Sequence, residues 1–168
     1  MSIEMMYLNG EIKRLEDELN KLYKTRNEIM LKVIQVDSNL YHKNLERLDS
    51  DYRTFLYPHF TADKFYLVFE GDAVGGFTVN KSGVIEGLFT LKKGIGARVF
   101  NKQIELTKEI MTGDRLRLFC ATDFLKDYYL EKGFMIDRIS EFDDKLAADG
   151  WNYKRFGRPN FYDMSRGV

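Results

Sequence analysis

Cysteine and proline are scarce in this sequence, and each scarcity excludes a class of protein. Cys120 is the only cysteine among 168 residues, so the chain can form no internal disulfide and no zinc site built from cysteines. The two prolines, with 44% hydrophobic and 14% aromatic residues, exclude a disordered or low-complexity chain. We therefore expect one globular domain with a substantial core, in a reducing compartment.

An excess of charge and a long apolar run are also missing. The 26 basic side chains balance 26 acidic ones, so no overall field attracts polyanions and we expect no nucleic-acid partner. No uncharged stretch approaches the ~20 residues that span a bilayer, and the N-terminus lacks the apolar segment of a signal peptide. His42 and His59 lack metal-ligand spacing, so we expect no metal site. These absences predict a soluble, cytoplasmic protein without a membrane partner.

Residues 1–30 carry apolar side chains at alternating steps of three and four, with charged residues between them. This heptad pattern predicts a helix whose apolar seam needs a partner. Two arrangements fit: a parallel or antiparallel two-stranded coiled coil between chains, or a helix folded back onto its own domain. A homodimer through this helix is the expected arrangement. The seam consists of Met5, Leu8, Ile12, Leu15, Leu19, Leu22 and Ile29, with Arg26 out of the pattern.

The rest of the chain is a series of short strands and helices without internal repeats. Residues 31–37 are rich in β-branched side chains and predict a strand, although the heptads could equally continue through them as one long helix. A helix is expected over 39–56. The further expected elements are an antiparallel meander over 64–72, 73–83 and 84–90, a helix over 97–111, a strand over 115–121, a short helix capped by Thr122 or Asp123 and running through Lys132, and strands over 134–142 and 160–166.

The stretch LKKGIG, residues 91–96, lies between the end of an expected strand and the start of a helix. The backbone N–H groups at a helix N-terminus have no partner within the helix and attract phosphate. Gly94 and Gly96 let a ligand come close to the backbone, and Lys92, Lys93 and Arg98 add positive charge. The stretch lacks the Gly-Lys-Ser/Thr of a P-loop and the third glycine of a dinucleotide fingerprint. By itself, such a turn is more often structural than ligand-binding.

A second stretch, DYYLEKGF at 127–134, ends a short helix with Gly133 and continues into a strand. The two stretches, in the order meander, glycine-turn helix, strand, short helix and strand, resemble the GNAT family of acyl-CoA-dependent N-acyltransferases from residue 31 to about residue 166. The resemblance implies an α+β fold of mixed α/β character. Its central, mostly antiparallel twisted sheet is splayed at the cofactor site and flanked by helices. The chain then divides into a coiled-coil helix, 1–30, and a GNAT-like domain, 31–168.

The resemblance also implies a function, the transfer of an acetyl group from acetyl-CoA to a primary amine by direct attack. Tyr129 matches the family's acid, which protonates the departing thiolate. Glu86 is a candidate base that relays a proton through water, and a backbone N–H near Leu88 or Phe89 stabilises the oxyanion. LKKGIG keeps both family glycines but has Leu91 where Gln or Arg is usual. The implied coenzyme A segment comprises Leu88, Phe89, Thr90, Leu91, Lys92, Lys93, Gly94, Ile95, Gly96, Ala97 and Arg98, together with Tyr129.

A function of a different class fits the same residues. Glu86 on a half-exposed strand is compatible with a solvated side chain, and Tyr129 with an aromatic ring packed under its helix. The competing hypothesis is therefore a GNAT-shaped binding or structural protein that has lost turnover and assembles through its coil. Cys120 lies in an apolar strand, which predicts a packed thiol rather than a nucleophile.

The acceptor amine cannot be identified from the sequence. In the resembling family its site is built from the loop after the first helix and from the last strands, here residues 57–61 and 151–162. The aromatic side chains of both segments are compatible with substrate recognition or with covering the core. Lys154, Arg155 and Arg158 form a small basic cluster that faces either an acidic acceptor or solvent.

Overall fold

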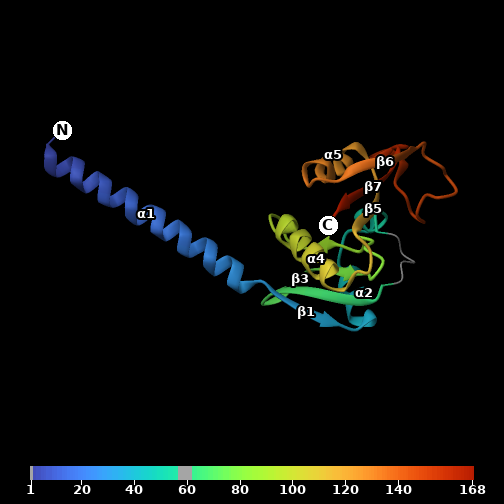
Figure 1. Cartoon of the computed structure of the whole chain (residues 1–168), viewed down its shortest axis with the longest axis horizontal. Coiled ribbons are helices and arrows are strands. Elements are labelled where there is room, and N and C mark those ends of the chain that lie inside the picture. Colours follow the sequence, from blue (N-terminus) through green and yellow to red (C-terminus); the bar gives the residue numbers. More distant parts are fainter. Residues whose placement is uncertain (1, 57–61) are drawn as a thin grey trace.

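A computed structural model describes residues 2–56 and 62–168 as one long helix and two sheets with shorter helices around them (Figure 1). The acceptor segment expected at 57–61 and the side chain of Ile29 lie outside the described residues. In the described ranges, no helix combines the length and apolar character needed to cross a membrane. Over the same ranges, no three His, Cys, Asp or Glu side chains gather closely enough to hold a metal ion.

Helix α1 (Ile3–Met30) projects away from the rest of the chain (Figure 1). The side chain of Ser2 caps it by accepting a hydrogen bond from the backbone N–H of Met5 at 3.2 Å. Because α1 projects away from the sheets, the alternative of a helix folded back onto its own domain is wrong. Between 47% and 67% of the surface of each described seam side chain is exposed, namely Met5, Leu8, Ile12, Leu15, Leu19 and Leu22.

Strand β1 (Lys32–Val36) follows α1 after one extended residue, Leu31. The expected strand at 31–37 is confirmed, and the alternative of one long helix is wrong. Strand β1 opens the first sheet, whose order is β1-β2-β3-β4 with antiparallel pairing throughout. The other members are β2 (Lys64–Glu70), β3 (Asp72–Val79) and β4 (Phe89–Thr90).

The prediction of a third meander strand over 84–90 is wrong for most of its length. Only Phe89 and Thr90 pair with β3, whereas Val84 forms a parallel bridge with Arg117. The cause lies at Gly87, whose φ of +70° turns the chain from one partner strand to the other.

The second sheet has the order β5-β7-β6, again antiparallel. Its strands are β5 (Arg115–Ala121), β6 (Met135–Ser140) and β7 (Phe161–Gly167). Between β5 and β6 lies α5 (Asp123–Glu131). Of the two expected caps, Thr122 caps this helix by accepting a hydrogen bond from the N–H of Leu125. Asp123 instead accepts a hydrogen bond from the hydroxyl of Tyr162 at 2.5 Å.

Two short helices replace the single helix expected over 39–56, which is a correction. They are α2 (Ser38–Leu45) and α3 (Ser50–Arg53). The side chain of Asp49 caps α3 by accepting a hydrogen bond from the N–H of Asp51 at 2.9 Å, so the chain leaves the first helix before it. A further short helix, α6 (Tyr153–Phe156), lies in a segment that the sequence pattern left without structure.

Helix α4 (Gly96–Ile110) confirms the helix expected over 97–111 and covers one face of the first sheet, packing its Val99 on Phe77 and Val79. Helix α2 covers the opposite face, where Tyr41 packs on Leu67 and the neighbouring strand residues. The two helices thus enclose the first sheet between them.

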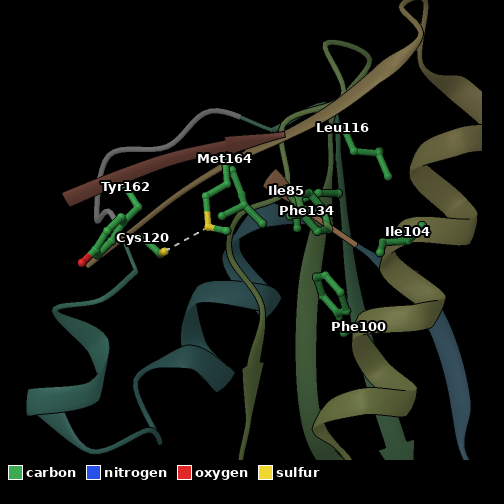
Figure 2. Close-up of a cluster of buried hydrophobic side chains, with 9 residues drawn as sticks. Ile85, Phe100, Ile104, Leu116, Cys120, Phe134, Tyr162 and Met164 are labelled. Carbon is green, nitrogen blue, oxygen red and sulfur yellow. Dashed lines mark hydrogen bonds between the residues drawn. The ribbon is translucent and has the colours of Figure 1, made fainter. Parts of the chain in front are cut away.

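A third cluster links α4 to the second sheet, and Figure 2 shows Ile85 and Phe134 between the α4 side chains Phe100 and Ile104 and the pair Cys120 and Met164. The sulfur of Cys120 lies 3.9 Å from that of Met164. Burial raises the pKa of the Cys120 thiol to about 12. The expected packed thiol is confirmed, because Cys120 is buried within this cluster.

Candidate active site

The two sheets are joined by backbone hydrogen bonds between β5 and residues 83–85, which precede β4 in the chain. The N–H of Ile85 donates to the carbonyl of Arg117 at 2.7 Å, and the N–H of Arg117 donates to the carbonyl of Gly83 at 3.0 Å. Beyond Gly87 the chain pairs with β3 instead, and β4 and β5 belong to separate sheets. Among the described residues no hydrogen bond joins β4 to β5, so the edge of each strand can accept an extended ligand as an added strand.

Three side chains clamp the backbone at the point where the edges part. The carbonyl of Glu86 accepts hydrogen bonds from Thr78 Oγ1 at 2.8 Å and from Gln103 Nε2 at 2.7 Å. Gln103 Nε2 also donates to the carbonyl of Thr78 at 3.1 Å. The hydroxyl of Tyr41 donates to the carbonyl of Gly87. This clamp (Tyr41, Thr78 and Gln103) fixes the bulge from the α2 side and from the α4 side at once.

Glycine is required at the bulge for space as well as for conformation. A Cβ on Gly87 would lie 2.8 Å from Cγ2 of Thr78 and 2.9 Å from the hydroxyl oxygen of Tyr41, both closer than van der Waals contact. The φ of +70° adds strain for any other residue.

The clamp residues were not identified from the sequence. A signal existed for Gln103, which is a polar residue on the apolar face of α4 between Phe100 and Ile104. Its side chain is fully buried, and a buried amide needs partners that the sequence does not name.

Strand register determines which backbone N–H groups face the gap. The N–H of Leu91 donates to the carbonyl of Val74 at 2.7 Å, and Phe89 pairs with Gly76 two residues along. In an antiparallel ladder alternate residues bond to the neighbouring strand, so the amide of Phe89 faces β3. The amides of Leu88 and Thr90 then point away from β3, toward β5. Of the two amides expected to stabilise an oxyanion, the register favours that of Leu88.

The glycine loop precedes α4 at the open end of the gap. Gly94 has a φ of +85°, and a Cβ built on Gly94 or Gly96 would meet no atom within 4 Å. Within the part of the chain that the structure describes, no side chain caps α4 at Ile95, and the amides of Gly96 and Ala97 lie too early in the helix for an intrahelical acceptor. Ile95 itself is 1% exposed and anchors the loop in the core. Uncapped amides with open space in front of them fit a diphosphate group.

The side chains of the loop differ from what its composition suggests. Lys92 donates to the carboxylate of Glu70 at 2.7 Å, so its charge is already paired. Leu91 is half-buried and packs on the cluster that contains Tyr41 and Phe89. Lys93 and Ala97 are exposed and Arg98 is half-buried. The backbone N–H groups of this loop, rather than the side chains of Lys92 and Lys93, are therefore the groups best placed to bind a ligand.

Tyr129 lies on α5 beside the core cluster that contains Cys120 and Phe100. Its ring centroid is 5.6 Å from that of Phe100 and 5.9 Å from that of Phe134. Burial, with the nearby Cys120 thiol, raises the pKa of Tyr129 well above its ordinary value. The phenol therefore holds its proton and is chemically a donor, and Leu88 packs against the same cluster.

Glu86 is half-buried and accepts a hydrogen bond from Nδ2 of Asn80 at 3.0 Å. Burial raises its pKa, and the hydrogen bond from Asn80 opposes the shift. Burial, and after it the charge of Glu86, raises the pKa of Tyr41 well above its ordinary value.

The expected acceptor segment at 151–162 meets α3. Trp151 and Phe156 pack on Phe55, with ring centroids 5.3 Å and 4.7 Å from it. Arg155 pairs with Asp51 at 3.1 Å, and Arg158 pairs with a neighbouring aspartate. Trp151 and Phe156 therefore cover the core, and Arg155 and Arg158 are each paired with a carboxylate rather than open to an acidic acceptor.

Comparison with known proteins links this architecture to a group of enzymes. Neither the protein-family models nor the curated proteins gave a match to the sequence. Solved structures do match. A GCN5-related N-acetyltransferase from Rhodopseudomonas palustris has a TM-score of 0.57 and 8% identity, covering 82% of this chain and 95% of that one.

Two further matches were determined with bound ligands. The spermidine N-acetyltransferase of Vibrio cholerae, in complex with CoA and spermine, has a TM-score of 0.57 and 11% identity over 81% of this chain and 94% of that one. A GNAT family acetyltransferase from Elizabethkingia anophelis with acetyl-CoA bound has a TM-score of 0.51 and 13% identity over 82% and 98%. At these identities the likeness concerns the fold.

Proposed function

Because this chain has the fold of the GNAT acetyltransferases, we propose that it transfers an acetyl group from acetyl-CoA to a primary amine. One observation carries the proposal: the edges of β4 and β5 part beyond Gly87, and the uncapped glycine loop lies at the open end of that gap. An extended ligand with a diphosphate at one end matches both features.

The described residues fit acetyl-CoA, which supplies the acetyl group as an activated thioester when it is bound. The amides of Gly94, Gly96 and Ala97 at the N-terminus of α4 would hold the diphosphate. The facing edges of β4 and β5 would hold the pantetheine arm in the manner of an added strand. The amide of Leu88 would donate a hydrogen bond to the thioester carbonyl oxygen.

Two side chains are proposed to move protons. An aliphatic amine has a pKa near ~10.4 and must lose a proton before it can attack, and Glu86 accepts this proton through water. The raised pKa of Glu86 makes its carboxylate a stronger base than an exposed one. Tyr129 donates a proton to the departing thiolate, for which a phenol that stays protonated is suited.

The test has a binding arm and a turnover arm. At a hundred times its dissociation constant, acetyl-CoA should stabilise the chain by about 2.7 kcal/mol, which raises the melting temperature by several degrees. Thiol release should then appear with at least one member of a panel of polyamines, amino acids, aminoglycosides and peptide amines. If acetyl-CoA leaves the melting temperature unchanged, the proposal is wrong.

The competing function is that of a GNAT-shaped binding or assembly protein, and two contacts favour it. Leu91 offers no polar atom to a diphosphate, and Lys92 is engaged by Glu70. Stabilisation by acetyl-CoA without thiol release across the whole panel would support this function over catalysis.

Assembly completes the proposal under either function. Helix α1 leaves an apolar seam exposed, and a homodimer through α1 would cover it. The unsubstituted chain should then sediment at twice the mass of a single chain.

A further inference from the structure

The seam of α1 is a continuous row of apolar side chains that the described chain leaves exposed. It runs along one face of a 28-residue helix that stands clear of both sheets (Figure 1). Beside it, Arg14 pairs with Glu11 at 2.9 Å and with Glu18 at 3.2 Å, so these two carboxylates are held on their own helix. The seam itself has no such partner within the described chain, and its cover must come from outside.

Charge is divided unevenly between the two halves of α1. Residues 3–18 contain five acidic and two basic side chains, whereas residues 19–30 contain three basic and one acidic side chain. The helix is therefore negative in its first half and positive in its second. A second copy running in the opposite direction presents the complementary sign to each half.

A parallel pair would place like charges together. Arg26 lies at a core position of the heptad and would face Arg26 of the second copy across the seam. Glu11 and Glu16 flank the seam on opposite sides and would meet across a parallel pair, carboxylate against carboxylate. The acidic halves would also lie side by side.

An antiparallel pair removes the encounters of Arg26 with Arg26 and of Glu11 with Glu16. Leu15 lies opposite Leu19 of the second copy, and Ile12 lies opposite Leu22, each pairing occurring twice by symmetry. Arg26 then lies opposite Leu8, one turn from Glu4 and Glu11 of the second copy, where its guanidinium can reach a carboxylate. Near the two-fold axis Glu16 and Glu18 face their own copies, and Arg14 already neutralises part of that charge.

From this distribution we infer that two copies of the chain associate through α1 as an antiparallel coiled coil. A helix of 28 residues is about 42 Å long, and the sheets begin at the C-terminal end of α1. The antiparallel pair therefore holds the two domains at opposite ends of a rod, with their candidate sites apart. The inference rests on the proposed self-association and is independent of acetyl transfer.

Single cysteines distinguish the two orientations. In an antiparallel pair, Glu16→Cys lies near the two-fold axis and should form an intermolecular disulfide under mild oxidation, whereas Arg26→Cys should not. In a parallel pair Arg26→Cys meets its own copy and Glu16→Cys does not. The native Cys120 is buried at 6% exposure and serves as the unreactive control in the unsubstituted chain.

The same full-length chain tests the seam itself by sedimentation. The double variant Leu15→Asp/Leu19→Asp should raise the dissociation constant of the dimer roughly a hundredfold or more. Lys13→Ala/Asp17→Ala, on the outer face, should leave that constant within about threefold. A monomeric unsubstituted chain, a dimer that survives the leucine substitutions, or cross-linking at Arg26→Cys but not at Glu16→Cys would each overturn the inference.

Discussion

The two halves of segment 83–91 differ in the strand that they bind. Residues 83–85 bond to β5, whereas residues 89–91 bond to β3, and Gly87 lies between them. The sequence is apolar and strand-like on both sides, so composition does not explain the difference. It comes from one positive φ angle and from three side chains that clamp the two carbonyls beside it. The change of partner strand thus depends on one local residue, Gly87, together with long-range contacts from α2, β3 and α4.

Replacing Gly87, where the chain changes its partner strand, should have the largest effect of the substitutions considered. Gly87→Ala forces a Cβ against Thr78 and Tyr41 and strains a positive φ, and we expect a loss of about 3 kcal/mol in the free energy of unfolding. Gly113→Ala is the matched control, because nothing lies within 4 Å of its Cβ, and it should stay within ~0.5 kcal/mol. Urea unfolding of the two variants measures both, and equal stabilities would contradict a constrained bulge.

Removing the hydroxyl of Tyr129 tests its proposed role as the proton donor to the departing thiolate. Tyr129→Phe keeps the ring contacts with Phe100 and Phe134 but removes the proposed proton donor. Turnover should fall about a hundredfold, with little change in the affinity for acetyl-CoA or in stability. Tyr128→Phe, the neighbouring control, should keep its turnover within about threefold. An unaltered rate for Tyr129→Phe would assign the acid elsewhere.

Cutting the clamp from the α4 side should have an intermediate effect. Gln103→Leu removes both hydrogen bonds to the carbonyls of Thr78 and Glu86, and we expect a loss of about 2 kcal/mol in unfolding free energy. Thr107→Val removes only a hydrogen bond within α4 and should cost less than ~1 kcal/mol. If the bulge positions the Leu88 amide, Gln103→Leu lowers kcat more than it changes KM for acetyl-CoA. A change in stability with kcat intact would limit the clamp to a structural role.

Glu86 should give the smallest effect, and its sign is diagnostic. Because burial raises its folded-state pKa, its contribution to stability is present below the unfolded-state pKa and is lost as pH rises through the folded-state pKa. Glu86→Gln removes the charge and should stabilise the chain at pH 7 by less than ~1 kcal/mol, since the side chain is half-exposed. The gain should vanish near pH ~4. Urea midpoints at both pH values decide this, and a gain of equal size at both would contradict the raised pKa.

Much of the fold could be predicted where local signals agree. Strand β5 was predicted at its observed bounds, because RLRLFCA alternates cleanly and a glycine turn precedes it. Helix α4 was predicted to within a residue at either end, because its apolar period is regular and Gly96 marks its start. The glycine loop needed no tertiary information either, since it is a contiguous motif.

The sequence did not reveal which distant residues the side chains of the site contact. The break between α2 and α3 depends on Asp49 acting as a cap, which the helical period conceals. The transfer from β5 to β3 at Gly87 depends on Gln103 and Tyr41, from helices on opposite faces of the sheet. The pairing of Lys92 with Glu70 was equally invisible, because the two residues are 22 positions apart. The elements of the candidate site were thus predictable, and the contacts that position it were not.

Residue-resolved amide hydrogen exchange with and without acetyl-CoA tests the central claim most directly. If acetyl-CoA binds between the parted edges, the amides of Leu88, Thr90 and 94–98 should gain protection, and the amide of Phe89, already bonded to β3, should change little. Protection confined to other parts of the chain, or no change at saturating acetyl-CoA, would contradict a binding site in the gap.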